Sequence, residues 1–139
     1  MKIAPLNICH YDKIITLWKK DPNIRLSEAD TKENIGFFLK RNKKTNYIVK
    51  DGTRVVGTIL CGNDGRRGYF HHVYIEEAYR NAGLGKRLVA LCEGKLKKIG
   101  ITKIHIFVLP GNIKGQAFWE QSGFYRRSEN EICMFSKDI

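Results

Sequence analysis

The chain has no apolar run long enough to cross a membrane, and its cysteines lack the spacing of a metal site. The four cysteines lie far apart, without a C-x-x-C pair or a nearby Cys/His group, at Cys9, Cys61, Cys92 and Cys133. We expect reduced, mostly buried thiols and no metal. Asp12 and Lys13 interrupt the apolar N-terminal segment, which is unlike a secretory signal peptide. These features predict a cytoplasmic protein that does not contact membranes.

Acidic side chains are also scarce. Lys and Arg number 25 against 14 Asp and Glu, which gives a formal net charge of +11. Such an excess attracts polyanions and phosphorylated ligands alike, so it does not distinguish a nucleic acid from a phosphate-rich cosubstrate. The length of 139 residues and the 42% of hydrophobic residues fit one compact domain over residues 1–139.

Two well-known glycine loops are missing. The sequence contains neither G-x-x-x-x-G-K-[ST] nor G-x-G-x-x-G with an acidic residue one strand later. Their absence disfavours a nucleotide triphosphatase and a dinucleotide enzyme. An RNP-type run and a helix-turn-helix are absent too, which disfavours a nucleic-acid module.

Local patterns predict alternating strands and helices. The expected elements are a strand at 1–6, a helix at 11–20, a helix capped by Ser27 or Thr31 that ends near Lys40, a hairpin of 47–50 with 54–61 around Asp51-Gly52, a strand at 69–75, a helix at 84–99, a strand at 103–109, a helix at 113–123 and a closing hairpin at 124–137. Residues 69–109 form a strand, helix and parallel strand, and the hairpins add antiparallel strands. The fold predicted is therefore α/β, with a mixed, mostly antiparallel central sheet flanked by helices.

The stretch "YRNAGLGKRL", residues 79–88, places two glycines where a helix begins. A helix N-terminus has unpaired N–H groups and partial positive charge, and Gly83 and Gly85 leave them open to a phosphate. Arg80, Lys86 and Arg87 add positive charge around them. The loop thus predicts phosphate binding; the alternative is an ordinary strand-to-helix turn on a basic surface.

Two segments resemble signatures of the GNAT superfamily of N-acetyltransferases. "VYIEEAYRNAGLGKRLV" is similar to motif A, in which Arg80, Gly83 and Gly85 fill [QR]-x-x-G-x-[GA]. Downstream, "NIKGQAFWEQSGF" resembles N-x-x-A-x-x-[FL]-Y-x-x-x-G-F. The two matches occur in the family's order and on the expected elements.

The resemblance implies a GNAT-like acyltransferase fold and acetyl-CoA as cosubstrate. It places the pyrophosphate and pantetheine of acetyl-CoA on a set of residues from both segments: Val73, Tyr74, Ile75, Arg80, Asn81, Ala82, Gly83, Leu84, Gly85, Lys86, Asn112 and Trp119. In the family, a bulge splays two parallel strands apart, and the pantetheine pairs with the exposed strand between them. The implied reaction is direct transfer of acetyl to a primary amine in a ternary complex, without a covalent enzyme intermediate.

Two positions depart from the family pattern. Trp119 stands where many relatives have a Tyr that protonates the leaving thiolate, and an indole N–H cannot supply that proton. Tyr74 or Tyr125 could replace it, or the thiolate leaves without full protonation, which we favour. Phe107 stands where N-terminal acetyltransferases often carry a Glu base. This difference weakens the interpretation of the protein as an N-terminal acetyltransferase.

A histidine on strand 69–75 is the favoured general base. The ordinary histidine pKa of about 6.5 suits proton transfer at neutral pH, and some relatives use a histidine on this strand. Because neighbouring strand residues face opposite sides, we expect only one of His71 and His72 to face the cleft, and we favour His71, on one face with Val73 and Ile75. Glu76 and Glu77 are the next candidates, and a structural histidine is the alternative.

Two other functions remain open from sequence. One is a basic nucleic-acid- or ribosome-associated module, which we rank second, and the other is a CoA-binding fold without catalysis. The identity of the amine acceptor does not follow from the residues, because fold alone does not name a substrate. Edge pairing or exchange of the last strand would give a homodimer.

Overall fold

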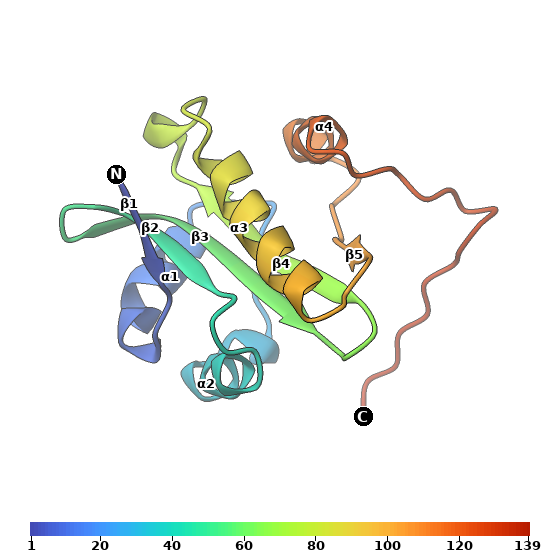
Figure 1. Cartoon of the computed structure of the whole chain (residues 1–139), viewed down its shortest axis with the longest axis horizontal. Helices are drawn as coiled ribbons and strands as arrows, with labels where there is room; N and C mark the ends of the chain where they lie inside the picture. The colour runs from blue at the N-terminus through green and yellow to red at the C-terminus, as the bar shows by residue number, and fades with distance from the viewer. The chain divides into compact units, whose positions relative to one another are not determined.

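The computed structural model describes all residues from 1 to 139. The chain forms two compact units, Met1–Phe107 and Val108–Ile139, and each is described by itself. The first unit contains a five-stranded sheet in the order β1-β2-β3-β4-β5 (Figure 1). The pairs from β1 to β4 are antiparallel, and β5 is parallel to β4. The prediction of a mixed, mostly antiparallel sheet flanked by helices is confirmed, whereas a single functional domain over 1–139 stays a prediction.

The elements follow the expected order. Their bounds are β1 Lys2–Pro5, α1 Tyr11–Trp18, α2 Lys32–Arg41, β2 Tyr47–Asp51, β3 Arg54–Asn63, β4 Gly68–Ile75, α3 Leu84–Lys98, β5 Ile104–His105 and α4 Ile113–Gln121. Short 3₁₀ turns lie at Ile8–His10, Glu28–Asp30 and Glu77–Tyr79.

Both predicted helix caps before α2 are used, on consecutive elements. The Ser27 hydroxyl accepts the N–H of Ala29 at 3.2 Å and caps the turn Glu28–Asp30. The Thr31 hydroxyl accepts the N–H of Asn34 at 3.2 Å and caps α2. Each bond satisfies a backbone donor that the element itself leaves unpaired. The two caps therefore fix the direction in which the turn leads into α2.

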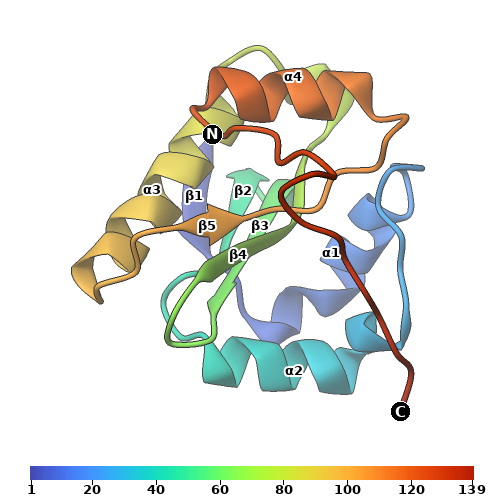
Figure 2. The same cartoon turned by 90° about the vertical axis from the view of Figure 1, so that its right-hand side faces the viewer.

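Helices cover both faces of the sheet. Figure 2 shows the strands between α3 and α1. On the face covered by α1 and α2, Ile14 and Trp18 pack with Leu60 of β3 and Tyr74 of β4 in one buried cluster. On the other face, α3 contacts β3 and β4 and buries one side of its own length, at Leu84, Leu88, Val89, Cys92 and Leu96. The apolar spacing of these helices thus corresponds to their buried faces.

One expected strand and the expected closing hairpin differ from the prediction. β5 has only 2 residues, paired as Gly68 with Ile104 and Tyr69 with His105. The closing hairpin at 124–137 is wrong, because this segment contains no strand. Its apolar side chains Met134 and Phe135 are exposed, and a two-stranded hairpin that buries no apolar face is marginal in water. No helix combines the length and the apolar character needed to cross a bilayer.

Leu88→Ala tests the packing of α3 on the sheet. Leu88 is fully buried, so its truncation leaves a cavity and is expected to lower the free energy of unfolding by about 2–5 kcal/mol. Leu91→Ala on the same helix is the control, because Leu91 is exposed, and its cost is expected to be below about 1 kcal/mol. Urea denaturation of both variants measures the difference, and equal losses would contradict this placement of α3.

Candidate active site

A bulge interrupts β4 near its middle. Leu60 of β3 lies opposite His71, and Thr58 lies opposite Tyr74. One residue of β3 therefore faces two residues of β4, His72 and Val73, and the register shifts between Thr58 and Leu60. His72 adopts the left-handed region with a φ of 47°. An extra residue of this kind bends its strand and redirects the side chains around it.

The bulge places both histidines on one face of the sheet. The His71 ring lies edge-on to Phe38 of α2, with ring centroids 6.0 Å apart. The His72 ring lies 4.5 Å from the ring of Trp18 of α1. The expectation that only one of them faces this side is wrong, because the extra residue breaks the two-residue alternation. His71 consequently shares its face with Tyr74 and not with Ile75.

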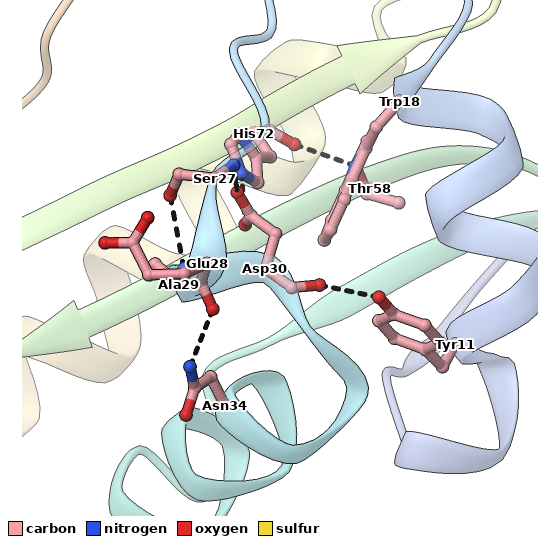
Figure 3. A network of polar contacts seen from close by, with 9 residues as sticks. All are labelled: Tyr11, Trp18, Ser27, Glu28, Ala29, Asp30, Asn34, Thr58 and His72. Carbon is pink, nitrogen blue, oxygen red and sulfur yellow. Dashed lines mark hydrogen bonds and ion pairs between the residues drawn. The ribbon is translucent and has the colours of Figure 1, made fainter.

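His72 is part of a polar network that links β4 to the turn before α2 (Figure 3). Its Nε2 lies 2.7 Å from Oδ1 of Asp30. The other carboxylate oxygen accepts the N–H of Ser27 at 3.0 Å, and the Asp30 carbonyl accepts the Tyr11 hydroxyl at 2.7 Å. Asp30 is thereby fixed on three sides.

A second chain of bonds holds the His72 backbone. The Thr58 hydroxyl donates to the His72 carbonyl at 2.7 Å and accepts the indole N–H of Trp18 at 2.8 Å. Thr58 and Trp18 are fully buried. Sequence reasoning missed Asp30 and Thr58 as site residues. The spacing Ser27-x-x-Asp30, which is that of a capping box, was the one local signal for Asp30.

The network perturbs the charges of its members. Burial lowers the pKa of His71, the charge of His72 lowers it further, and Asp30 opposes both effects. Burial acts to raise the pKa of Asp30, but the hydrogen bond and charge of His72, with the bond from Ser27, lower it overall. His71 is therefore neutral and Asp30 ionised at neutral pH.

The strand β4 extends beyond its pairing with β5. The parallel register ends at Tyr69 and His105, whereas β4 continues to Ile75. From His71 onward β4 has no partner strand on that side. Backbone groups on that side can pair with an extended ligand, as an exposed sheet edge does, apart from the Ile75 carbonyl, which accepts the Arg80 side chain.

The N-terminus of α3 is open. Its N-cap Gly83 has a φ of 77° and offers no side-chain cap, and the first turn contains no acidic residue. The first helical backbone bond runs from Arg87 N–H to the Gly83 carbonyl at 3.1 Å, so the N–H groups of residues 84–86 precede the helical ladder. A Cβ at Gly83 would meet no atom within 4 Å, which shows open space on that side. Asn81 is also left-handed, with a φ of 64°.

Side chains tie the loop before α3 to the sheet. Arg80 donates through Nε to the Ile75 carbonyl at 2.7 Å and lies over the Tyr74 ring. Glu76 pairs with Lys20 at 3.1 Å and also with Arg54. Two cations thus engage the Glu76 carboxylate, which disfavours it as the base.

Asn112 and Trp119 belong to the second unit. The Asn112 side chain caps α4 by accepting the N–H of Gly115 at 2.9 Å. The Trp119 ring is buried, with ring centroids 4.9 Å from both Phe118 and Phe124. Their contacts with a cosubstrate stay predictions.

Comparisons with known proteins identify the family to which this fold belongs. Residues 11–124 match the model of the acetyltransferase (GNAT) family. The chain therefore belongs to this family, which confirms the resemblance seen in its motifs, and it is an acetyltransferase of the small bacterial type.

Relatives of known sequence and structure agree with this assignment. An acetyltransferase of Photorhabdus laumondii is 26% identical over 139 residues, which cover 100% of this chain and 96% of the relative. The structure of an aminoglycoside 6'-N-acetyltransferase of Acinetobacter haemolyticus superposes with a TM-score of 0.76 at 19% identity, covering 100% and 99% of the two chains. The PaiA N-acetyltransferase of Thermoplasma acidophilum, in complex with coenzyme A, gives a TM-score of 0.75 at 20% identity, with 89% of each chain covered. At these identities the structures establish the shared fold.

Asp30→Asn tests how the pair with His72 stabilises the fold. Because the pKa of Asp30 lies below its ordinary 3.8 in the folded protein, the ionised carboxylate stabilises the native state above about pH 4. This contribution is lost as the pH falls through the lowered pKa. We expect the wild-type protein to exceed the variant in free energy of unfolding at pH 7, and the difference to shrink toward about pH 2.

Urea denaturation across this pH range measures the difference. Asp138→Asn, at an exposed position near the chain end, is the control and is expected to match the wild-type protein at every pH. A difference between wild type and Asp30→Asn that stays constant with pH would contradict a stabilising contact between the ionised Asp30 carboxylate and His72.

Proposed function

We propose that the protein is an acetyl-CoA-dependent N-acetyltransferase that transfers acetyl directly to a primary amine in a ternary complex. The observation that supports this best is the combination, in a GNAT-family chain, of an uncapped helix N-terminus at Gly83 with an unpaired strand edge from His71 to Ile75. The first feature suits a pyrophosphate and the second an extended amide chain. Coenzyme A contains both.

The proposed binding mode assigns each part of acetyl-CoA to this chain's residues. The backbone amides from Asn81 to Lys86 receive the pyrophosphate, with positive charge from Arg80, Lys86 and Arg87. The backbone of Val73, Tyr74 and Ile75 pairs with the pantetheine amides. The family resemblance adds Asn112 and Trp119 to the proposed cosubstrate-binding residues. Arg80 acts on the pyrophosphate through its positive charge, because its Nε already donates to the Ile75 carbonyl.

The reaction needs an acceptor amine that has lost a proton and a donor that stabilises the oxyanion. A strand N–H beside the bulge supplies the donor in this proposal, and a histidine of the bulge supplies the base, for which the sequence favours His71. The coenzyme leaves as a thiolate, since an ordinary thiol pKa of about 8 to 9 makes full protonation unnecessary. Trp119 is limited to donating a hydrogen bond.

The cysteines favour direct transfer over a covalent enzyme intermediate. Cys61 and Cys92 are buried, and the hydrogen bond with Cys61, together with burial, raises the pKa of the Cys92 thiol. A nucleophilic cysteine needs the opposite shift, toward the thiolate. Cys9 and Cys133 are exposed and lie outside the bulge.

The central experiment measures acetyl-CoA binding and turnover separately. Isothermal titration is expected to show acetyl-CoA binding at micromolar protein. A thiol-release assay with polyamines, amino acids, aminoglycosides and peptides with free N-termini then identifies the acceptor class. Absence of binding heat would refute the enzyme assignment, and binding without turnover on any amine would favour a CoA-binding protein without catalysis.

A second candidate function is binding of a polyanion such as RNA. Four lysines, Lys40, Lys43, Lys44 and Lys95, line a hollow of about 690 Å³ that contains no acidic residue. None of the residues of the β4 bulge lines it. Titration with RNA at two salt concentrations tests this candidate, because phosphate-backbone binding weakens steeply as salt rises.

The double variant Lys86→Ala/Arg87→Ala tests the phosphate site. It removes positive charge at the N-terminus of α3 and is expected to weaken acetyl-CoA binding about tenfold, since each charge-assisted contact contributes about 0.5–1.5 kcal/mol at a partly exposed site. Lys97→Ala/Lys98→Ala removes the same charge at the other end of the helix. This control is expected to change affinity less than about threefold, because solvent screens distant charges. Equal losses in titration would contradict a local phosphate site.

A further inference from the structure

The two histidines of the β4 bulge differ in how firmly they are held. The His72 ring is fixed by Asp30 at Nε2, by the Trp18 ring and by the bond from Thr58 to its own carbonyl. The His71 ring has the edge-on contact with Phe38 and makes no side-chain hydrogen bond. Only His72 has the carboxylate partner that orients an imidazole and stabilises its cation.

The bond to Asp30 also determines which nitrogen of His72 is available. In the neutral imidazole, Nε2 carries the proton because the ionised carboxylate only accepts hydrogen bonds, and Nδ1 keeps its lone pair. Nδ1 makes no hydrogen bond within the protein, and it does not belong to the fully buried, unpaired polar atoms. The side chain is 17% exposed. The free lone pair is therefore accessible from outside the network.

The backbone at His72 points to a purpose beyond packing. A non-glycine residue in the left-handed region costs about 1–3 kcal/mol and persists only where the surroundings fix it. Here Thr58 and Trp18 fix it from a fully buried position. Such strained residues cluster at functional sites, and this one lies where β4 has no β5 partner.

We propose that Nδ1 of His72, rather than His71, takes the proton from the acceptor amine, and that Asp30 is the positioning residue of His72. This inference rests on the proposed acetyltransferase function. As the amine nitrogen bonds to the carbonyl carbon, its proton moves to Nδ1. The C–S bond breaks and its electron pair leaves on sulfur. His72 then returns the proton to the thiolate or to water. In each turnover the amine therefore loses one proton and gains one acetyl group.

The surrounding charges fit this role. Three titratable groups face one another: Asp30 from the turn before α2, with His71 and His72 from β4. α1 contributes the indole of Trp18 and the hydroxyl of Tyr11, β3 the hydroxyl of Thr58, and α2 the ring of Phe38. A cation formed on His72 thus has Asp30 as its counter-ion and a neutral His71 as its neighbour.

The first test compares variants of the two histidines with the acceptor identified by the amine panel. His72→Asn keeps a residue that tolerates a positive φ, and it is expected to lower kcat by about 100-fold or more while acetyl-CoA affinity stays within about twofold. His71→Gln tests the competing candidate base: a kcat within about threefold is expected if His72 is the base, and a large loss is expected if His71 is. His72→Gly with added imidazole provides a second readout, in which the rate is expected to rise with imidazole concentration.

The second test addresses Asp30. Asp30→Asn removes the negative partner of the imidazolium, so the acid limb of the pH–rate profile is expected to move to lower pH and kcat to fall by about tenfold or more. A residue that only maintains the fold would change kcat without moving the limb. In the free protein, ¹⁵N NMR of the His72 ring is expected to show the Nε2–H tautomer above pH 7.

Each outcome decides the proposal. Any one of four results would overturn it: wild-type activity in folded His72→Asn, loss of activity in His71→Gln instead, no response of folded His72→Gly to imidazole, or an Nδ1–H tautomer of His72. Should the His72 variants fail to fold, an unmoved acid limb in Asp30→Asn would overturn it as well. Failure of the wild-type protein to transfer acetyl to any amine would refute the proposed function itself. Loss of activity in the variants alone bears only on the identity of the base.

Discussion

One extra residue in β4 is the constraint on which the rest of the site depends. Between the pairs His71 with Leu60 and Tyr74 with Thr58, β4 has one residue more than β3. The strand bends there, beyond the point at which its pairing with β5 has ended. One edge of β4 is consequently left free for an extended ligand, and two histidines are brought to the face covered by α1 and α2. A regular strand would place the two histidines on opposite faces of the sheet.

The bulge persists because long-range polar contacts offset its cost. The left-handed backbone of His72 is unfavourable, and burying the polar groups of Thr58 and Asp30 adds a desolvation cost. Each of these groups has a partner: Thr58 has the Trp18 indole and the His72 carbonyl, and Asp30 has Ser27, Tyr11 and His72. A fully satisfied network stabilises one arrangement, whereas the loss of one member leaves the others buried and unpaired. The network therefore fixes the geometry of the bulge as well as the orientation of the ring.

Sequence reasoning succeeded where the signal is local. Each of three predicted positions depends only on the backbone within a few residues, and the structure confirms them: Gly52 in the hairpin turn, Thr31 as a helix cap and Gly83 at the start of α3. The bulge depends instead on Trp18 and Thr58, which lie 40 residues apart in sequence. Strict alternation along 69–75 therefore assigned the wrong face to one histidine. The closing hairpin failed for a related reason: a strand pattern needs a surface on which to bury its apolar face, whereas Met134 and Phe135 are exposed.

Asp30 connects the segment between α1 and α2 to β4, although the two lie far apart in the sequence. Asp30 lies in the turn that ends the connection from α1 to α2, whereas His72 lies in the strand whose free edge suits the cosubstrate. Any displacement of that connection must move the carboxylate, and with it the orientation of the His72 ring, because a single 2.7 Å contact joins them. If the first two helices select the acceptor, binding of the correct amine and positioning of the base share one structural element. Residues of the α1–α2 connection would then influence turnover without touching acetyl-CoA, and substitutions there would change kcat together with acceptor preference.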